Sequence, residues 1–253
     1  MAKIVVIGGT GLIGSKVVAQ LAEQGHEAVA ASPNTGVDTI SGEGLAEALT
    51  AADVVVDVSN SPSFEENAVL RFFTTSTGNL LAAERAAGVG HHVALTIVGT
   101  NRPHVIPYFR AKVAQEKLIR ESGMPYSLVH ATQFFEFLQS IADVSTDGDT
   151  VRLPGALIQP IAAEDVATAV ARTAAAEPLN ADIEIAGPEV FGLDEFIRRG
   201  LTFRGDPRTV VRDDDAQYYG AKIDERTLLP VESAQLFQTR LADWLRADPP
   251  RSR

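Results

Sequence analysis

The amino-acid sequence predicts an α/β fold built on one parallel sheet, and three observations support this prediction. Short apolar runs rich in Val and Ile alternate with Ala-rich segments of helical period, which is typical of repeated strand–helix–strand units. The first apolar run leads directly into a glycine-rich turn, VVIGGTGLIG at residues 5–14. With 45% apolar residues among 253, the chain can bury a sizeable core.

The order of elements follows from these runs. The apolar runs predict five strands, at residues 3–7, 28–31, 54–58, 93–98 and 126–129. The segments between them predict helices, at residues 12–24, 45–50, 64–87 and 109–122. Three of these helices should end at Gly25, Gly88 and Gly123, because glycine readily adopts the left-handed conformation that closes a helix.

The pattern becomes looser beyond residue 132. Two further strands are expected, at residues 150–153 and 183–186. Helices are expected at residues 164–176 and 193–200, and a last amphipathic helix at 234–245. The sequence contains no internal repeat and no linker, so we expect one sheet domain whose last third covers the carboxyl ends of the strands.

Composition excludes several classes of function. The chain has no cysteine, which rules out disulfides, thiolate catalysis and the usual zinc sites, and we expect no metal. A net charge of −11 disfavours nucleic acid and anionic membranes, because binding to phosphate backbones relies on clustered Lys and Arg. Lacking a long apolar stretch and a signal-peptide pattern, the protein is expected to be cytoplasmic and to act on a small molecule. Whether it forms a homodimer stays open.

The glycine turn predicts a dinucleotide site. Gly9, Gly11 and Gly14 fit the pattern G-x-G-x-x-G, and Gly8 with the last two fits a looser version. Such glycines permit a tight strand-to-helix turn, let a pyrophosphate approach the backbone, and let the helix pack on the sheet. The anion then meets free N–H groups at the start of a helix. This context predicts a Rossmann-type, doubly wound parallel sheet, with residues 1–131 as the dinucleotide-binding core and 132–253 as a mixed core and substrate-cap region.

The type of dinucleotide is indicated by the end of the second predicted strand, AVAASPNTG at residues 28–36. NAD sites usually place an Asp or Glu there for the ribose 2′-hydroxyl, and NADP sites an Arg nearby. Neither is present. Ser32, Asn34 and Thr35 can hydrogen-bond a 2′-phosphate, and no carboxylate repels it, so NADP(H) is favoured over NAD(H).

A tyrosine and a lysine lie one helical turn apart in YFRAK. Tyr108 and Lys112 share a helix face, and an adjacent ammonium is expected to lower the pKa of the phenol, making it a usable acid at neutral pH. The strand before this helix carries Thr96 and is followed by Thr100, whose hydroxyls can polarise a carbonyl.

The combination of VVIGGTGLIG, TSTGNLLAAERAAGV, VALTIVGT, YFRAK and PIAAEDVATAV resembles the short-chain dehydrogenase/reductase superfamily, specifically its atypical NmrA-like, NAD(P)-binding branch. The likeness covers nearly the whole chain and is strongest up to about residue 171. It implies a catalytic triad of Thr96, Tyr108 and Lys112. It also implies that DVSNS, at residues 57–61, runs along the adenosine ribose. The full set of cofactor contacts expected from motif and resemblance is Gly8, Thr10, Gly11, Leu12, Ile13, Gly14, Ser32, Asn34, Thr35, Ser59, Asn60, Lys112, Ala131 and Thr132.

Two departures from the branch bear on function. His130 and Ala131 stand where members commonly carry Arg-Pro beside the nicotinamide, and Thr replaces the commoner Ser at position 96. The resemblance implies an NAD(P)H-dependent oxidoreductase that reduces a small carbonyl, a quinone or an aromatic polyketide-like acceptor. A non-catalytic NAD(P)-sensing regulatory protein is the alternative. A polyketide-tailoring oxygenase or isomerase on the same fold is a weaker one.

Substrate contacts are expected from the strand ends and the cap. These candidates are Thr100, His104, Gln133, Phe134 and Tyr218. Phe134 and Phe137 fall on one helical face, which fits core packing as well as an aromatic substrate. His91 and His92 lack a neighbouring acid at metal-ligand spacing and are expected in a surface loop.

Overall fold

The computed structural model describes residues 1–100, 102 and 106–247 of the chain. The chain divides into two compact units that interleave along the sequence. Unit 1 comprises Met1–His130 and Val166–Ile183, and unit 2 comprises Ala131–Asp165 and Glu184–Arg253. The prediction of a single domain with a boundary at residue 131 stays a prediction.

Seven strands form one mostly parallel sheet, in the order β12-β9-β5-β4-β3-β1-β2. They are β1 Lys3–Ile7, β2 Glu27–Ala31, β3 Val54–Asp57, β4 His91–Ile97, β5 Tyr126–Ala131, β9 Ala181–Ala186 and β12 Gln235–Leu236. The first strand pairs in parallel with both β2 and β3, so the chain turns outward in two directions from β1. The predicted Rossmann-like α/β fold is therefore confirmed.

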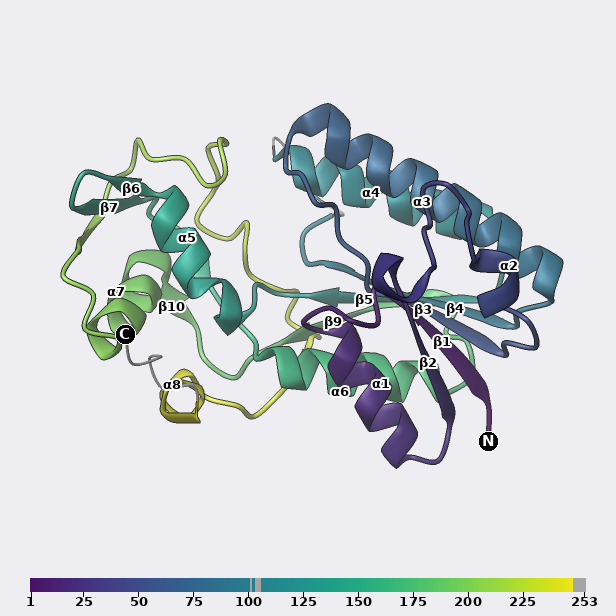
Figure 1. The fold of residues 1–253 in the computed structure, drawn as a ribbon. Coiled ribbons are helices and arrows are strands. Elements are labelled where there is room, and N and C mark those ends of the chain that lie inside the picture. The colour runs from purple at the N-terminus through teal and green to yellow at the C-terminus, as the bar shows by residue number, and fades with distance from the viewer. Residues whose placement is uncertain (101, 103–105, 248–253) are drawn as a thin grey trace. The chain divides into compact units, whose positions relative to one another are not determined.

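Helices cover both faces of this sheet in unit 1. They are α1 Gly14–Glu23, α2 Leu45–Ala48, α3 Glu66–Ala87, α4 Pro107–Glu121 and α6 Ala163–Ala174, with a short 3-10 turn, η1, at Pro33–Thr35. Figure 1 shows α3 and α4 side by side over one face, with α1 and α6 on the other. The predicted glycine stops are confirmed, since Gly25, Gly88 and Gly123 all have positive φ. Val5, Val55 and Leu80 lie within the apolar core that joins the strands to α3.

The described part of unit 2 forms two small sheets and three α-helices. Its other elements are η2 Phe135–Phe137, α5 Leu138–Val144, β6 Thr146–Asp147, β7 Thr150–Leu153, β8 Leu157–Ile158, β10 Phe191–Gly192, α7 Leu193–Phe203, β11 Thr209–Arg212 and α8 Leu241–Ala247. Strand β7 pairs with β6 and β11, and β8 pairs with β10. Gly200 lets α7 approach α5 closely, because a Cβ there would lie 2.0 Å from a methyl group of Leu138.

The predicted helix at 234–245 is wrong in its first half. Residues Gln235 and Leu236 form β12, and the backbone N–H of Phe237 donates to Ala186, so this stretch pairs with the sheet edge at β9. Helix α8 begins only at Leu241, whose N–H donates to the Glu189 carboxylate. Backbone hydrogen bonds to β9 therefore outweigh the local amphipathic pattern, which predicts a helix here.

The expectation of a surface loop at His91 and His92 is also wrong. Both residues open β4 and are buried, with exposed fractions of 3% and 0%. His92 Nδ1 lies 2.8 Å from Glu84 Oε1, and His91 Nε2 lies 2.8 Å from Ser127 Oγ. Partners on α3 and β5 make their burial tolerable.

Among the described residues, none of the helices has both the length and the apolar character to span a bilayer.

Candidate active site

In the glycine turn between β1 and α1, neighbouring backbone atoms lie very close to three of the glycines. Gly8 has φ of +78°, and a Cβ there would come within 3.0 Å of the Ser59 backbone. A Cβ on Gly9 would lie 2.6 Å from Ala30 Cα, and one on Gly14 would lie 2.2 Å from the Gly8 carbonyl oxygen. Side chains at these three positions would collide with the protein itself.

Gly11 differs from the other three glycines. A Cβ there would meet only the Gly8 oxygen, at 3.2 Å, and the residue is exposed. Its lack of a side chain therefore leaves room on the outer side of the turn. Helix α1 starts at Gly14 with no side-chain cap and no acidic residue in its first turn. The N–H groups of Ser15 and Lys16 already donate to the Gly11 and Ile13 oxygens, so within the described residues the amides left for an outside partner are those of Leu12, Ile13 and Gly14. Room and free donors together fit the pyrophosphate of a dinucleotide.

The segment after β2 forms a compact polar turn. The Thr10 hydroxyl donates to Ser32 Oγ at 3.0 Å, which joins this segment to the glycine turn. Thr35 Oγ1 accepts a hydrogen bond from the Ser32 N–H at 2.9 Å, so it serves the turn η1. Asn34 is exposed. The three residues assigned to a 2′-phosphate thus lie together at the carboxyl end of β2.

The loop after β3 approaches the glycine turn through Ser59. Asp57 is buried, and its Oδ1 accepts from the Ser59 N–H at 2.9 Å. Ser59 Oγ is buried without a hydrogen-bond partner among the described residues. Asn60 Oδ1 accepts from the Tyr108 hydroxyl at 3.1 Å. An unpaired buried hydroxyl beside the glycine turn fits a bound ligand.

Tyr108 lies in the first turn of α4, among aromatic rings. The ring of Phe73 meets it edge-on with centroids 5.8 Å apart, and the ring of Phe64 lies 6.0 Å away. Burial, reinforced by the negative charge of Asp57, raises the pKa of Tyr108. This is the opposite of the lowered value that the spacing to Lys112 suggests. Burial raises the pKa because it takes the phenolate out of water, and the Lys112 ammonium is directed to Leu95 and Gln115 instead.

Lys112 is buried and points back toward the sheet. Its Nζ donates to the Leu95 carbonyl oxygen at 2.9 Å and to Gln115 Oε1, and it lies 4.3 Å from the centroid of the Phe73 ring. Gln115 in turn donates to Asp57 Oδ2 at 3.0 Å. Burial lowers the pKa of Lys112 to about 8, while Asp57 and Glu116 act in the opposite sense.

Thr96 and Thr100 share one buried carboxylate. Thr96 donates to Glu116 Oε1 at 2.5 Å, and Thr100 donates to Glu116 Oε2 at 3.2 Å. His130 Nε2 lies 3.7 Å from Glu116, and Arg120 donates to the same carboxylate at 3.1 Å. Both threonine hydroxyls therefore face α4, and the assignment of Thr96 to the acceptor oxygen stays a prediction.

Of the predicted contacts not yet placed, Leu12 is exposed and Ile13 is buried just before α1 in unit 1. The predicted residues from Ala131 onward belong to unit 2, and His104 lies outside the described residues. Thr132 and Gln133 follow β5 and are buried, and so is Ala131. The ring of Phe134 stacks on that of Phe137, with centroids 5.0 Å apart. Tyr218 is buried against the ring of Tyr219.

Sequence reasoning missed three residues that organise the unit 1 site. Gln115 and Glu116 follow Lys112 on α4, and the i to i+4 spacing from Lys112 to Glu116 places that acid on the same helix face. Phe73 comes from α3 and contacts both Tyr108 and Lys112. Only the helix-face spacing of Glu116 is visible in the sequence.

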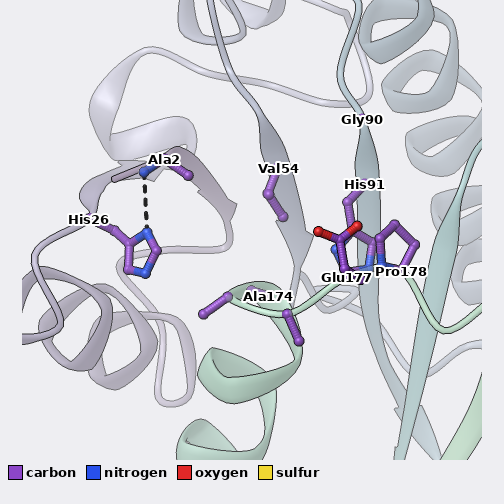
Figure 2. A pocket seen from close by; sticks show the side chains of 10 residues that line it. Ala2, His26, Val54, Gly90, His91, Ala174, Glu177 and Pro178 are labelled. Atoms are coloured by element: carbon purple, nitrogen blue, oxygen red, sulfur yellow. Dashed lines mark hydrogen bonds between the residues drawn. The ribbon is translucent and has the colours of Figure 1, made fainter.

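A separate cavity of about 260 Å³ lies in unit 1 at the amino ends of the strands, away from the glycine turn. Figure 2 shows His26 accepting a hydrogen bond from the Ala2 N–H, with His91 and Glu177 farther along the wall. These residues stand at the amino ends of the strands or after α6. Ligands of parallel sheets bind at the carboxyl ends, so this cavity is not the candidate active site.

Comparisons with known proteins agree with the dinucleotide site that the glycine turn predicts. The model of a family described as NAD(P)H-binding matches residues 8–177. The chloroplastic divinyl chlorophyllide a 8-vinyl-reductase of Cucumis sativus is 28% identical over 221 residues, covering 73% of this chain and 52% of the relative. The chain spans about half the length of the curated relatives it matches.

Solved structures show the same fold at low identity. MoeE5 in complex with UDP-glucuronic acid and NAD has a TM-score of 0.71 at 18% identity, covering 99% of this chain and 94% of that one. The dTDP-4-dehydrorhamnose reductase of Bacillus anthracis, in complex with NADP, has a TM-score of 0.67 at 13% identity, with the same coverage.

Proposed function

Because the chain belongs to the NAD(P)H-binding family, within the atypical short-chain dehydrogenase/reductase, NmrA-like group that its motifs predict, we propose that it is an NAD(P)H-dependent reductase of a small carbonyl or quinone. The observation that carries the proposal is the exposed Gly11 beside the uncapped start of α1. A nicotinamide dinucleotide supplies a hydride when bound there. An aromatic polyketide-like acceptor belongs to the same proposal.

The residues of unit 1 would hold the dinucleotide in three places. The glycine turn, with Leu12 and Ile13, offers N–H groups to the pyrophosphate. Ser32 and Asn34 follow β2, where the adenosine ribose is expected, and no acid stands among residues 32–37, so we propose NADP(H) as the preferred form. Ser59 gains a partner for its buried hydroxyl.

Tyr108 is proposed as the proton donor and Lys112 as a contact to the nicotinamide ribose. Since burial raises the pKa of Tyr108, the phenol stays protonated at neutral pH and can donate its proton. The phenolate left behind would be costly, and we propose that the Lys112 ammonium, one helical turn along α4, offsets part of that cost.

A dinucleotide sensor is the second candidate function. It is favoured by the existing hydrogen bonds of the two hydroxyls in the implied triad, since Thr96 donates to Glu116 and Tyr108 to Asn60. A sensor binds NADPH without consuming it.

Separate titrations with NADPH and NADH, followed by a screen of quinones and aldehydes for NADPH oxidation, test the proposal. The proposed reductase should bind NADPH more tightly than NADH and oxidise NADPH with at least one acceptor. Tyr108→Phe should then lower kcat at least a hundredfold with an unchanged Kd for NADPH. Tight binding with no oxidation would replace the reductase by the sensor, and no binding of either coenzyme would refute both.

A further inference from the structure

A chain of buried side chains connects the end of β3 with Lys112 on α4, within unit 1. Asp57, Gln115 and Lys112 have exposed fractions of 1%, 1% and 3%. Asp57 Oδ2 accepts from Gln115 Nε2 at 3.0 Å, and Gln115 Oε1 accepts from Lys112 Nζ. An amide therefore lies between a buried carboxylate and a buried ammonium.

The orientation of the Gln115 amide is fixed by its two neighbours. A carboxylate only accepts hydrogen bonds and an ammonium only donates them, so the amide NH2 group must face Asp57 and its oxygen must face Lys112. Asp57 is itself held in place, because its Oδ1 accepts from the Ser59 N–H at 2.9 Å. The ammonium is therefore oriented by a carboxylate that it does not contact.

This arrangement leaves one N–H of Lys112 for a ligand. An ammonium has three N–H bonds, and Lys112 donates two of them, to Gln115 and to the Leu95 oxygen. The Phe73 ring lies beside Nζ, 4.3 Å away at its centroid, and no oxygen of the described residues accepts the third N–H.

The carboxylates near Lys112 favour its charged form. Burial lowers the pKa of Lys112 to about 8, and the negative charge of Asp57 opposes this more strongly than that of Glu116 does. Glu116 is also paired with Arg120, which offsets its charge. The charge of Lys112 therefore depends chiefly on Asp57.

Further titratable groups lie near Asp57 in the same unit. Tyr108 on α4 and His92 on β4 both lie close enough to be affected by its charge, and Glu84 on α3 pairs with His92. Within the described residues, none of these three makes a hydrogen bond to Asp57 or Lys112. The hydrogen-bonded connection from the carboxylate to the ammonium is the one through the Gln115 amide.

We propose that Asp57 and Gln115 are positioning residues for Lys112, which keep its ammonium charged and oriented so that the remaining N–H can meet the coenzyme. The inference rests on the proposed function, in which Lys112 contacts the nicotinamide ribose. It differs from the ribose contact expected of residues 57–61, because both oxygens of Asp57 are already occupied by Ser59 and Gln115.

The test compares Asp57→Asn and Gln115→Met with the control Asp53→Asn. Asp53 directly precedes β3, is exposed, and accepts from the Lys3 N–H at 2.8 Å, so its variant makes the same charge change at the other end of the strand. Gln115→Met leaves Asp57 intact and carries the test if Asp57→Asn does not fold.

Two quantities are measured for each protein. The titration of Lys112 is followed by NMR of its ε-carbon without coenzyme, and Lys112→Arg identifies the signal. The Kd of NADPH is measured at pH 6 and at pH 8.

The midpoint of the Lys112 titration should fall by about one pH unit or more in Asp57→Asn and in Gln115→Met, and should not move in Asp53→Asn. With a fall from about 8 to about 7, the factor 1 + 10^(pH − pKa) makes the ratio of the Kd at pH 8 to the Kd at pH 6 rise about fivefold. A defect in folding alone would change both Kd values and leave this ratio as it is in wild type.

An unshifted Lys112 titration in either folded variant would overturn the inference, and so would a shift in the control as large as that in Asp57→Asn. Wild-type protein that binds neither coenzyme would remove the proposed function. The NMR titration would still decide whether Asp57 and Gln115 control the charge of Lys112, so the two failures are distinguishable.

Discussion

The protonation of Lys112 should control the affinity for NADPH. Burial lowers the pKa of this ammonium to about 8, so it loses its charge within an accessible pH range. If only the charged form holds the anionic coenzyme, the apparent Kd grows by the factor 1 + 10^(pH − pKa). That factor is about 1.1 at pH 7 and about 11 at pH 9, which is a tenfold loss, or about 1.4 kcal/mol.

Fluorescence titration of NADPH between pH 7 and pH 9 measures this loss. Lys112→Arg is the matched control, because a guanidinium keeps its charge over the whole range. Its Kd should not depend on pH, and Lys112→Met should bind weakly throughout. Unfolding does not mimic the effect. A lysine whose folded pKa lies below its unfolded value of 10.5 contributes stability that rises, not falls, between about pH 8 and 10.5.

A wild-type Kd that stays constant from pH 7 to pH 9 would refute the reasoning. An equal rise of the Kd with pH in Lys112→Arg would also refute it, because the titrating group would then be one other than Lys112.

Three further predictions concern the turn and the buried histidines. Gly11→Ala should fold normally yet weaken the binding of NADPH at least tenfold in titration. Gly14→Ala should instead lower the free energy of unfolding, measured in urea, by about 1–3 kcal/mol, because its Cβ would meet the Gly8 oxygen. Equal stability of the two variants would contradict this. Burial lowers the pKa of His91 from 6.5 to about 4, so wild-type protein should lose about 2–3 kcal/mol more than His91→Gln between pH 7.5 and pH 4.5, as the unfolded chain takes up the proton; parallel urea curves would count against it. His92→Phe leaves Glu84 buried and unpaired and should cost about 3–5 kcal/mol, most of it recovered when Glu84→Leu is added; a double variant as unstable as the single one would exclude the pairing.

Local sequence pattern was sufficient to predict the glycine turn and the strands of the large sheet other than β12. The strands at 3–7 and 150–153 match the prediction at both ends, because apolar runs bounded by turn residues specify them without help from distant partners. The same holds for Gly88, whose left-handed conformation follows from its place after a helix. Because α4 follows β4 in the chain, Tyr108 in its first turn comes after the carboxyl end of that strand.

Distant partners explain what the sequence did not reveal. His92 is buried because Glu84 faces it from α3, and residues 235–236 form a strand because β9 offers an edge. The pKa of Tyr108 depends on its burial against Phe73, which no spacing within YFRAK encodes. Each of these outcomes depends on a partner in another helix or strand.

The tight packing of backbone around Gly8, Gly9 and Gly14 bears on the thermodynamics of recognition. A segment held by such contacts has few alternative conformations to lose, so little configurational entropy is given up when an anion settles on it. Association should accordingly be rapid and enthalpically favourable, with the loop geometry alike in free and liganded protein.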